Sequence, residues 1–394
     1  MFDPEEIPPI KKAIQECALL DRQLLDDLRN EVSQMKPFVR VIKPRSITTF
    51  SLVASESTNN KLVYDPFYFQ LIRVVDCNGR NLCLDVITPT TNSDLLSRRQ
   101  FYENGEPKTA LGTLMKDLRC QTLNELSPMI PTGKLMHDHP DQVSNSWVQV
   151  YRDLCEWAVL YDRICNEGFA SNTIVIKDGL LRSKIFKYDK ANGRALFIEM
   201  MNRINDSIAE AYTKRKVRIF FVGLAKHSQV LARYSLAMQL EDVLPPGEPR
   251  YAQVPEVMEE RSYIWKEYMK KKDSEGDELE GVEKNKYSVG TLYLVRFGKS
   301  RVDPVWAIDL LSTQSRSDAE IFGYLFTDTI HGFPVAHYPA CLQRALENAQ
   351  IVDFDLEILQ DEVIKAVKSI LPAGRQEIID EQSLINDHLS NRQS

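Results

Sequence analysis

The sequence predicts an α/β protein in which helices flank a mixed sheet. Residues 67–75 and 81–87 are β-prone runs joined by an Asn-Gly pair, which is typical of a hairpin turn. Residues 172–181 contain four consecutive β-prone residues, as expected for a strand buried on both faces. Between these strands, residues 144–165 carry apolar side chains at helical spacing. A hairpin followed by a helical crossover predicts both antiparallel and parallel pairing.

Composition narrows the class of protein. The chain has 394 residues, of which 43% are hydrophobic and 27% charged, with a formal net charge of −7. This length suits two or three ordinary domains or one large decorated domain. The charge argues against a uniformly basic surface but is compatible with a local nucleic-acid groove. Because the sequence shows neither a membrane-spanning apolar run nor a secretory signal, we expect a cytoplasmic protein.

The metal-ligating residue types are mostly scattered. Seven cysteines occur without a CxxC pair, which predicts free thiols in a reducing compartment. His137-Asp138-His139 is the densest local group, but no second group follows at a recognisable spacing. We therefore interpret that group as part of a polar loop.

The N-terminal part of the chain is predicted to be helical. Apolar residues recur three or four positions apart over residues 10–36, which predicts a long amphipathic helix. Such a helix packs on its own core or forms a protein–protein contact, and the pattern leaves both interpretations open. We assign residues 1–40 to this segment.

The first predicted strand covers residues 47–55. It ends at Glu56, and the Ser-Thr-Asn-Asn sequence that follows predicts a loop. After the hairpin comes a polar stretch at 88–143, with a short helix expected near 108–119. The helix at 144–165 and the strand at 172–181 complete this half.

Helices and strands continue to alternate in the second half of the chain. A helix is expected at 194–213 and a buried strand at 216–226, whereas residues 235–286 have the low apolar content of an insertion near their end. Strands at 289–297 and 304–311 predict a hairpin, and helices are expected near 336–350 and 354–370. We therefore predict one domain over 41–372, with an insertion at 235–286 and a polar tail at 373–394.

This order of elements is that of a ribonuclease-H-like (RNase H-like) sheet. In that architecture, acids come from the first strand, the first core helix and the central strand that follows. Here these positions hold Glu56, Glu156 and Asp178. Asp178 ends a buried strand, where ligands gather in α/β sheets. Glu156 lies in an apolar stretch, where an unpaired carboxylate costs roughly several kcal/mol to desolvate.

The three acids have a functional and an ordinary interpretation. Together they could hold one or two Mg²⁺ or Mn²⁺ ions through hard oxygen ligands. Two ions about 4 Å apart would activate water and stabilise the leaving oxygen of a phosphodiester. Alternatively, Glu56 is a solvated strand end, Glu156 pairs with Arg152 one turn earlier, and Asp178 belongs to a turn. Their joint order favours the metal site.

Four short motifs resemble those of the NurA nuclease family over about residues 45–355. They are a strand with a following acid at 54–58, Asp-Gly-x-Leu at 178–181, a strand with Gly and Lys-x-Ser at 221–228, and Tyr-Pro with a later Ala-x-Ile at 338–351. Two motifs depart from the family, and the first of them also lacks the family's glycine after the acid. Glu56 replaces its Asp, and Leu346 stands where its C-terminal histidine is found, unless His337 or His331 supplies that ligand.

The resemblance implies a metal-dependent DNA nuclease with an RNase H-like fold. It implies Mn²⁺ or Mg²⁺ as cofactor, a two-metal mechanism, a homodimer, and a hexameric HerA-type ATPase as partner. The associated processes are DNA end processing in repair and defence against phage. The two departures keep a second interpretation open, namely a catalytically attenuated adaptor that binds DNA ends and the ATPase. A related nuclease acting on RNA is a further alternative, because no motif indicates recognition of a 2′-hydroxyl.

The resemblance also implies roles for individual residues. The expected catalytic residues are Glu56, Glu156, Asp178 and Tyr338, and the first three of these are the expected metal ligands. The expected DNA-binding residues are Lys226, Ser228 and Arg45.

Overall fold

The computed structural model describes residues 6–46, 50–64, 67–189, 193–267 and 287–372. The chain forms two compact units. Unit 1 comprises Met1–Ala54 and Arg163–Gln343, and unit 2 comprises Ser55–Asp162 and Arg344–Ser394. The predicted tail at 373–394 and the charged run at 270–286 lie outside the described residues. The predicted boundaries at residues 40 and 372 stay predictions.

Unit 1 begins with two consecutive helices, α1 (Ile7–Leu20) and α2 (Arg22–Ser33), followed by the 3₁₀ turn η1 (Lys36–Phe38). They replace the single predicted helix at 10–36, with the break at Asp21. None of the α1 side chains is buried, whereas α2 buries Val32, and Met35 just after it is also fully buried. The predicted amphipathic pattern therefore serves the core only in its second half.

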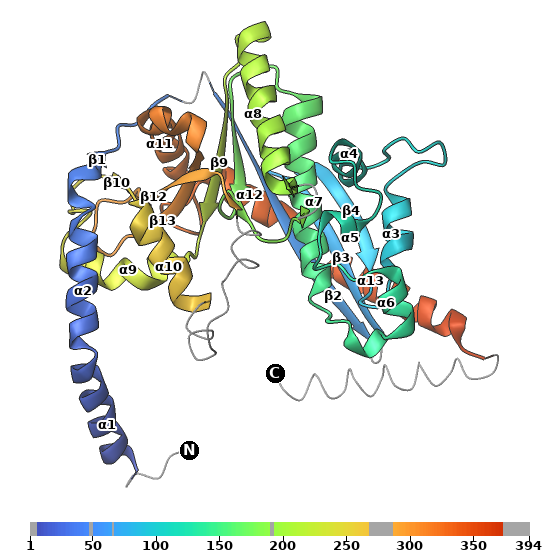
Figure 1. The fold of residues 1–394 in the computed structure, drawn as a ribbon, viewed down its shortest axis with the longest axis horizontal. Helices are drawn as coiled ribbons and strands as arrows, with labels where there is room; N and C mark the ends of the chain where they lie inside the picture. Colours follow the sequence, from blue (N-terminus) through green and yellow to red (C-terminus); the bar gives the residue numbers. More distant parts are fainter. Residues whose placement is uncertain (1–5, 47–49, 65–66, 190–192, 268–286, 373–394) are drawn as a thin grey trace. The chain divides into compact units, whose positions relative to one another are not determined.

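The sheet of unit 1 is mixed, as predicted. Its strands lie in the order β1 (Val39–Val41), β10 (Arg250–Gln253), β12 (Gly290–Arg296), β13 (Trp306–Leu311), β9 (Ile219–Ala225) and β5 (Thr173–Asp178) (Figure 1). The β5–β9 pair is parallel, and the other pairs in this series are antiparallel. The parallel pair is connected by the crossover helix α8, as a βαβ unit requires. The buried strands β5 and β9 and the β12–β13 hairpin confirm the corresponding predictions.

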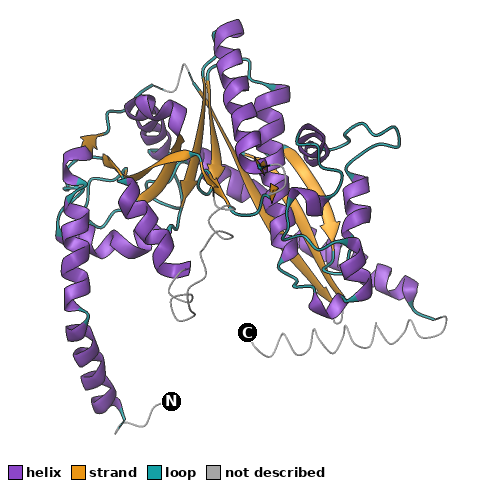
Figure 2. Ribbon diagram, viewed as in Figure 1, coloured by secondary structure: helices purple, strands orange, loops and turns teal. Residues whose placement is uncertain are grey.

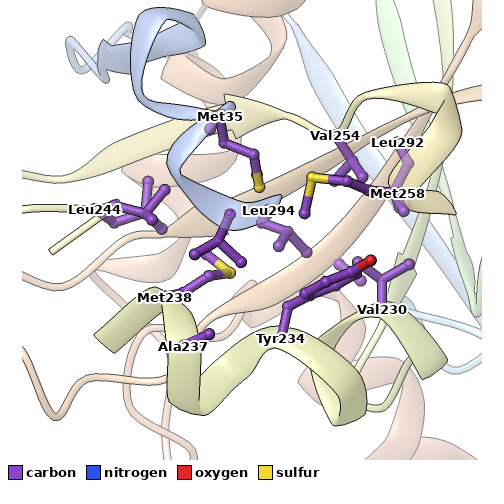
Figure 3. Close-up of a cluster of buried hydrophobic side chains, with 14 of the residues drawn as sticks. Met35, Val230, Tyr234, Ala237, Met238, Leu244, Val254, Met258, Leu292 and Leu294 are labelled. Atoms are coloured by element: carbon purple, nitrogen blue, oxygen red, sulfur yellow. The ribbon is translucent and has the colours of Figure 1, made fainter. Parts of the chain in front are cut away.

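The remaining elements of unit 1 are helices and short strand pairs. The helices are η4 (Arg163–Glu167), α8 (Leu196–Arg215), α9 (Gln229–Leu240), α10 (Glu256–Glu267), η6 (Ser312–Ser317), α11 (Asp318–Thr329) and the start of α12 (Ala340–Ala349). The short strands β6 (Arg182–Ser183) and β11 (Tyr287–Ser288) pair with each other, as do β7 (Tyr188–Asp189) and β8 (Arg194–Ala195). Figure 3 shows how Met35, Tyr234 and Met258 pack with Leu292 and Leu294 in one core of this unit.

The stretch at 235–286 contributes to the fold more than its composition suggested. Its first residues complete α9, its middle forms β10 between β1 and β12, and α10 follows. The strand β10 is short and preceded by prolines, so its sequence resembles a loop. Its Tyr251 ring packs against Tyr293 and Phe322, which explains the burial of this segment. The strand β1 and the helix α11 were also not predicted.

Unit 2 contains an antiparallel series of β2 (Ser51–Tyr64, entering from unit 1), β3 (Phe67–Asp76) and β4 (Asn81–Ile87). The β3–β4 turn matches the Asn-Gly prediction. Gly79 has φ of +81°, and the Asp76 carboxylate accepts hydrogen bonds from the N–H groups of Asn78 and Arg80. Its helices are α3 (Ser93–Arg99), α4 (Ala110–Asp117), α5 (Leu123–Leu126), α6 (Gly133–Asp138), η3 (Pro140–Gln142), α7 (Trp147–Asp162), the end of α12, and α13 (Asp353–Ile370) (Figure 2).

The end of the first predicted strand was placed wrongly. The sequence predicted that the strand stops at Glu56 and that polar residues lead into a loop. Instead, β2 continues to Tyr64 and pairs residue by residue with β3 from Ser55 onward. The polar side chains are compatible with this because the ladder bonds are made by the backbone. Glu56 is therefore an interior strand residue.

Two expectations from composition can be compared with the structure. None of the seven cysteines, all of which lie in the described residues, forms a disulfide. In the part of the chain that the structure describes, no helix combines the length and apolarity needed to cross a bilayer.

Candidate functional site

Asp178 occupies the predicted position at the carboxyl end of a buried strand. From Thr173 to Lys177 every residue of β5 is buried, and the Asp178 side chain is 26% exposed. Gly179 follows with φ of +99°, a conformation that favours glycine, and its N–H donates to the Leu224 carbonyl on β9 at 2.7 Å. This turn ends the strand abruptly and brings the Asp178 carboxylate to the surface.

A lysine lies beside Asp178, and this lysine in turn contacts an aromatic pair. Lys226 directly follows β9, and its Nζ lies 3.9 Å from an Asp178 carboxylate oxygen. The same Nζ lies 5.2 Å from the centre of the Tyr338 ring, a cation–π distance. Tyr338 is 1% exposed and packs on Trp306, with ring centres 5.0 Å apart. The structure thus brings the predicted residues Asp178, Lys226 and Tyr338 together.

A buried ion network, missed from the sequence, holds the segment after Asp178. The Arg182 guanidinium bonds both Asp309 carboxylate oxygens at 2.9 Å and donates to Glu259 at 2.5 Å. Asp309 is fully buried and also accepts from the Leu181 N–H. Burial raises the pKa of Glu259 above its ordinary value, although Arg182 opposes this shift. An acid inside the apolar run of β13 was the signal that could have revealed this network.

Glu156 is held in unit 2 by the helix α7, which packs against β3 and β4. Glu156 is 4% exposed, and its carboxylate accepts a hydrogen bond from the Ser57 hydroxyl at 2.9 Å. The alternative ion pair with Arg152 is not formed. The Arg152 guanidinium instead bonds the neighbouring Asp153 at 2.7 Å. Glu156 is thus a desolvated acid facing a strand hydroxyl.

Glu56 lies on the other face of β2. Successive strand residues point to opposite faces, and Ser57 points toward α7 and Glu156. Glu56 therefore shares its face with Thr58, whose hydroxyl donates to the Ala349 carbonyl of α12, and with Leu62, which packs in the α13 cluster. Figure 1 shows α7 and α13 on opposite sides of these strands. Glu56 is 8% exposed.

The predicted DNA-binding residues and the candidate histidines make local contacts within their own segments or with neighbouring ones. The Ser228 hydroxyl caps α9 by accepting from the Leu231 N–H, and the Arg45 N–H donates to the Gly323 carbonyl. His337 lies 3.7 Å from Asp303, while His331 is exposed and Leu346 is partly buried. His137 hydrogen-bonds its neighbour Asp138 on α6.

The predicted ligands differ in how they are placed for a metal ion. Asp178 belongs to unit 1, and Glu56 and Glu156 belong to unit 2. Over the described ranges of the chain, no three His, Cys, Asp or Glu side chains are grouped as a metal site. The donor chemistry nevertheless fits, because carboxylate oxygens are the ligands that Mn²⁺ and Mg²⁺ accept.

Comparisons with solved structures identify similar folds. A crystal structure of the NurA nuclease from Sulfolobus solfataricus has 12% identity, covers 93% of this chain and 98% of that chain, and superposes with a TM-score of 0.41. This chain is similar to NurA nucleases. NurA bound to dAMP and manganese has 10% identity, 93% and 99% coverage and a TM-score of 0.37.

The chain also has a weaker similarity to an Argonaute structure. A Marinitoga piezophila Argonaute in complex with guide RNA and target DNA has 10% identity and a TM-score of 0.26, and 31% of that chain is covered. No protein-family profile matches the chain. No curated protein matches it either.

Proposed function

We propose that this chain is a metal-dependent DNA nuclease of the NurA type. The observation that carries the proposal is the arrangement around Asp178. A carboxylate at the carboxyl end of a fully buried parallel strand lies 3.9 Å from a lysine that follows the adjacent strand. Ligand sites of α/β sheets concentrate at such strand ends. An accessible acid beside a cation suits a reaction on a phosphodiester.

The roles follow from the chemistry of the side chains. Glu56, Glu156 and Asp178 are the proposed ligands for Mn²⁺ or Mg²⁺, which would activate water and stabilise charge on the leaving oxygen. Lys226 contacts a DNA phosphate through its ammonium group. The buried Tyr338 holds Lys226 over its ring and is the proposed group that orients the scissile phosphate. Ser228 and Arg45 are proposed further contacts to the DNA backbone.

The proposed biological setting comes from the motif resemblance. It comprises a cytoplasmic homodimer that receives DNA ends from a hexameric HerA-type ATPase, in DNA repair or phage defence. The exposed apolar residues of α1 support a role in contacting a partner. Ile14, Leu19 and Leu20 are 63%, 70% and 82% exposed, respectively.

The direct test is cleavage of labelled linear and single-stranded DNA by the full chain. Cleavage is expected with Mn²⁺, with higher rates when the HerA-type ATPase is added, and EDTA is expected to stop it. The Asp178→Asn variant serves as the inactive control. A folded wild-type protein that leaves both DNA substrates intact in Mn²⁺, with and without the ATPase, contradicts the proposal.

A second candidate function is the attenuated adaptor, which binds DNA ends and the ATPase without cutting. The opposite orientations of Glu56 and Ser57 favour it, because a serine and not an acid faces Glu156. Under this candidate, DNA binding is retained in the absence of cleavage. Ser57→Asp, which places a carboxylate on the face of Glu156, is then expected to introduce or raise Mn²⁺-dependent cleavage.

A further inference from the structure

A cavity of about 380 Å³ opens in unit 1 beside Lys226. Its lining includes Lys226 after β9, Arg296 at the end of β12, and Ser228 and Ser235 on the α9 side. Since β9 and β12 both end here, the cavity lies at the strand ends where α/β proteins bind ligands. The proposed nuclease residues do not account for most of this cavity.

Arg296 is the most unusual residue of the lining. It is 3% exposed, and its Nη2 donates to the Pro245 carbonyl at 2.6 Å. Its buried Nε has no hydrogen-bond partner, and no carboxylate of the described residues forms an ion pair with the guanidinium. Burial lowers the pKa of Arg296 from its ordinary value. The Asp303 and Asp242 carboxylates, which border the cavity, oppose this shift, but neither pairs directly with Arg296. The buried Nε therefore still lacks an acceptor, which is costly for a charged donor.

The acids near the cavity are already engaged by other groups. The Asp242 carboxylate pairs with Arg301 at 2.7 Å. The Asp303 carboxylate accepts from the Ser300 N–H at 2.7 Å and lies 3.7 Å from His337. Three cations and two acids border the cavity, which leaves a net charge of 3 − 2 = +1 with neutral histidine.

A second arginine adds positive charge next to Arg296, although its own guanidinium pairs with Glu248 at 3.1 Å. Arg250 on β10 lies directly opposite Arg296 on β12 in the antiparallel register. Like charges at directly opposite positions destabilise a sheet. The Nε of Arg250 is likewise buried without a hydrogen-bond partner. An anion bound at Arg296 would offset this repulsion.

The helix α9 adds a favourable dipole. Its N-cap Ser228 borders the cavity, so the positive end of a 12-residue helix faces the same space as Lys226 and Arg296. Helix N-termini combined with arginine are common phosphate sites. The buried Arg296 Nε, which has no hydrogen-bond partner, distinguishes this helix start from an ordinary capped one.

We propose that this cavity binds the phosphate group of a nucleotide, supplied either by a free nucleoside monophosphate or by the backbone of a DNA strand. The inference deepens the proposed nuclease function, because Lys226 borders both the cavity and Asp178. Phosphate binding is nevertheless measurable without cleavage. A failure of the cavity proposal and a failure of the nuclease proposal therefore give different results.

The test uses a matched pair of substitutions on α9. Ser235 is exposed and borders the cavity, whereas the adjacent Leu236 is exposed and is not part of its lining. Ser235→Glu places a negative charge at the cavity, and Leu236→Glu places the same charge on the same helix outside it. Binding of inorganic phosphate, dAMP and an oligo(dT) strand is measured on the full chain in EDTA by calorimetry and fluorescence anisotropy.

The proposal expects wild-type and Leu236→Glu proteins to bind phosphate with equal affinity. Ser235→Glu should weaken binding about tenfold or more, the factor produced by about 1.4 kcal/mol. Arg296→Gln should do the same, with a melting curve to verify folding. If these two variants lose binding of oligo(dT) but keep binding of dAMP, the phosphate comes from the DNA backbone. If they lose binding of dAMP but keep binding of oligo(dT), it comes from the free nucleotide.

Two results overturn the proposal. One is the absence of phosphate, dAMP and oligo(dT) binding in the wild-type protein. The other is binding that is equal in wild type, Ser235→Glu and Leu236→Glu. Loss of Mn²⁺-dependent cleavage in Asp178→Asn, with phosphate binding intact, is compatible with the proposal and tests the nuclease function separately.

Discussion

Asp178 and Glu156 are both proposed metal ligands, but their surroundings are opposite. The Asp178 side chain is 26% exposed and lies near the Lys226 ammonium group. Glu156 is 4% exposed within a packed helix and accepts a hydrogen bond from a serine. Asp178 therefore contributes little to stability, because its charge is partly solvated. Glu156 is nearly buried, so a substitution of this carboxylate acts on the packed interior of unit 2.

The largest expected effect is that of Asp178→Asn. Removing this carboxylate should lower Mn²⁺-dependent DNA cleavage by at least about 100-fold, because several kcal/mol of charge stabilisation depend on the ion. The free energy of unfolding should change by less than about 1 kcal/mol, since the partly exposed pair with Lys226 contributes little. Cleavage rates and thermal melting measure the two quantities.

Asp206→Asn is the matched control for Asp178→Asn, because Asp206 is an exposed acid on α8 of the same unit. Its cleavage rate should equal that of the wild type. If Asp178→Asn is folded and cuts DNA at the wild-type rate, Asp178 does not belong to the site.

Glu156→Gln should distinguish a role of Glu156 in DNA cleavage from a role in the stability of the fold. Cleavage should fall by about 100-fold, whereas the melting temperature should stay within about 4 °C of the wild type, because Gln keeps the size and shape of Glu. The Gln side chain can still accept from Ser57. Asp153→Asn, one turn earlier on α7, should leave cleavage unchanged and serves as control. A lower melting temperature with full activity would assign Glu156 a structural role.

Glu56→Gln tests whether Glu56 is a metal ligand. Of the three proposed ligands, it has the least structural support, because it lies on the face of β2 opposite to Glu156. If Glu56 is a ligand, cleavage should fall by about tenfold or more, and Mg²⁺ should be affected more than the more tolerant Mn²⁺. Glu56→Asp should keep measurable activity. Wild-type rates in Glu56→Gln would exclude Glu56 as a ligand and agree with its place on the face opposite to Glu156.

The smallest expected change is that caused by deleting α1. This helix has only exposed side chains, whereas the segment after it contains buried ones. Deleting residues 1–20 should leave the melting temperature within about 2 °C of the wild type, because α1 buries no residue. Deleting residues 1–36 should lower it clearly, since Val32 and Met35 are fully buried. If the shorter deletion weakens dimerisation or ATPase binding in light-scattering and pull-down experiments, α1 is an interaction element.

Local patterns in the sequence predicted many of the elements. Helical periodicity located α7 and α8, and continuous β-prone runs located β5 and β9. The Asn-Gly pair identified the turn at Gly79. These predictions succeeded because short-range backbone preferences and a buried face determine such elements. The same reasoning identified Asp178 as a strand-end acid beside a glycine turn.

Other features depend on distant partners. The strand β2 continues past Glu56 because β3 supplies a backbone ladder, and β10 is a strand because β1 and β12 lie on its two sides. Arg152 bonds Asp153 although Glu156 is one turn away. None of these pairings has a sequence signal of its own, because a ladder or an ion pair depends on which groups folding brings together.

Residue types and their spacing predicted the class of fold, most of the elements in their order and the acids that we propose as metal ligands. The three-dimensional structure was needed to show that Lys226 contacts both Asp178 and Tyr338, that Ser57 and not Glu56 faces Glu156, and that the Arg296 Nε is buried without a hydrogen-bond partner. The physical reason is that side-chain type and periodicity are local properties. The electrostatic environment of a group is instead set by residues that are distant in the chain and close in space.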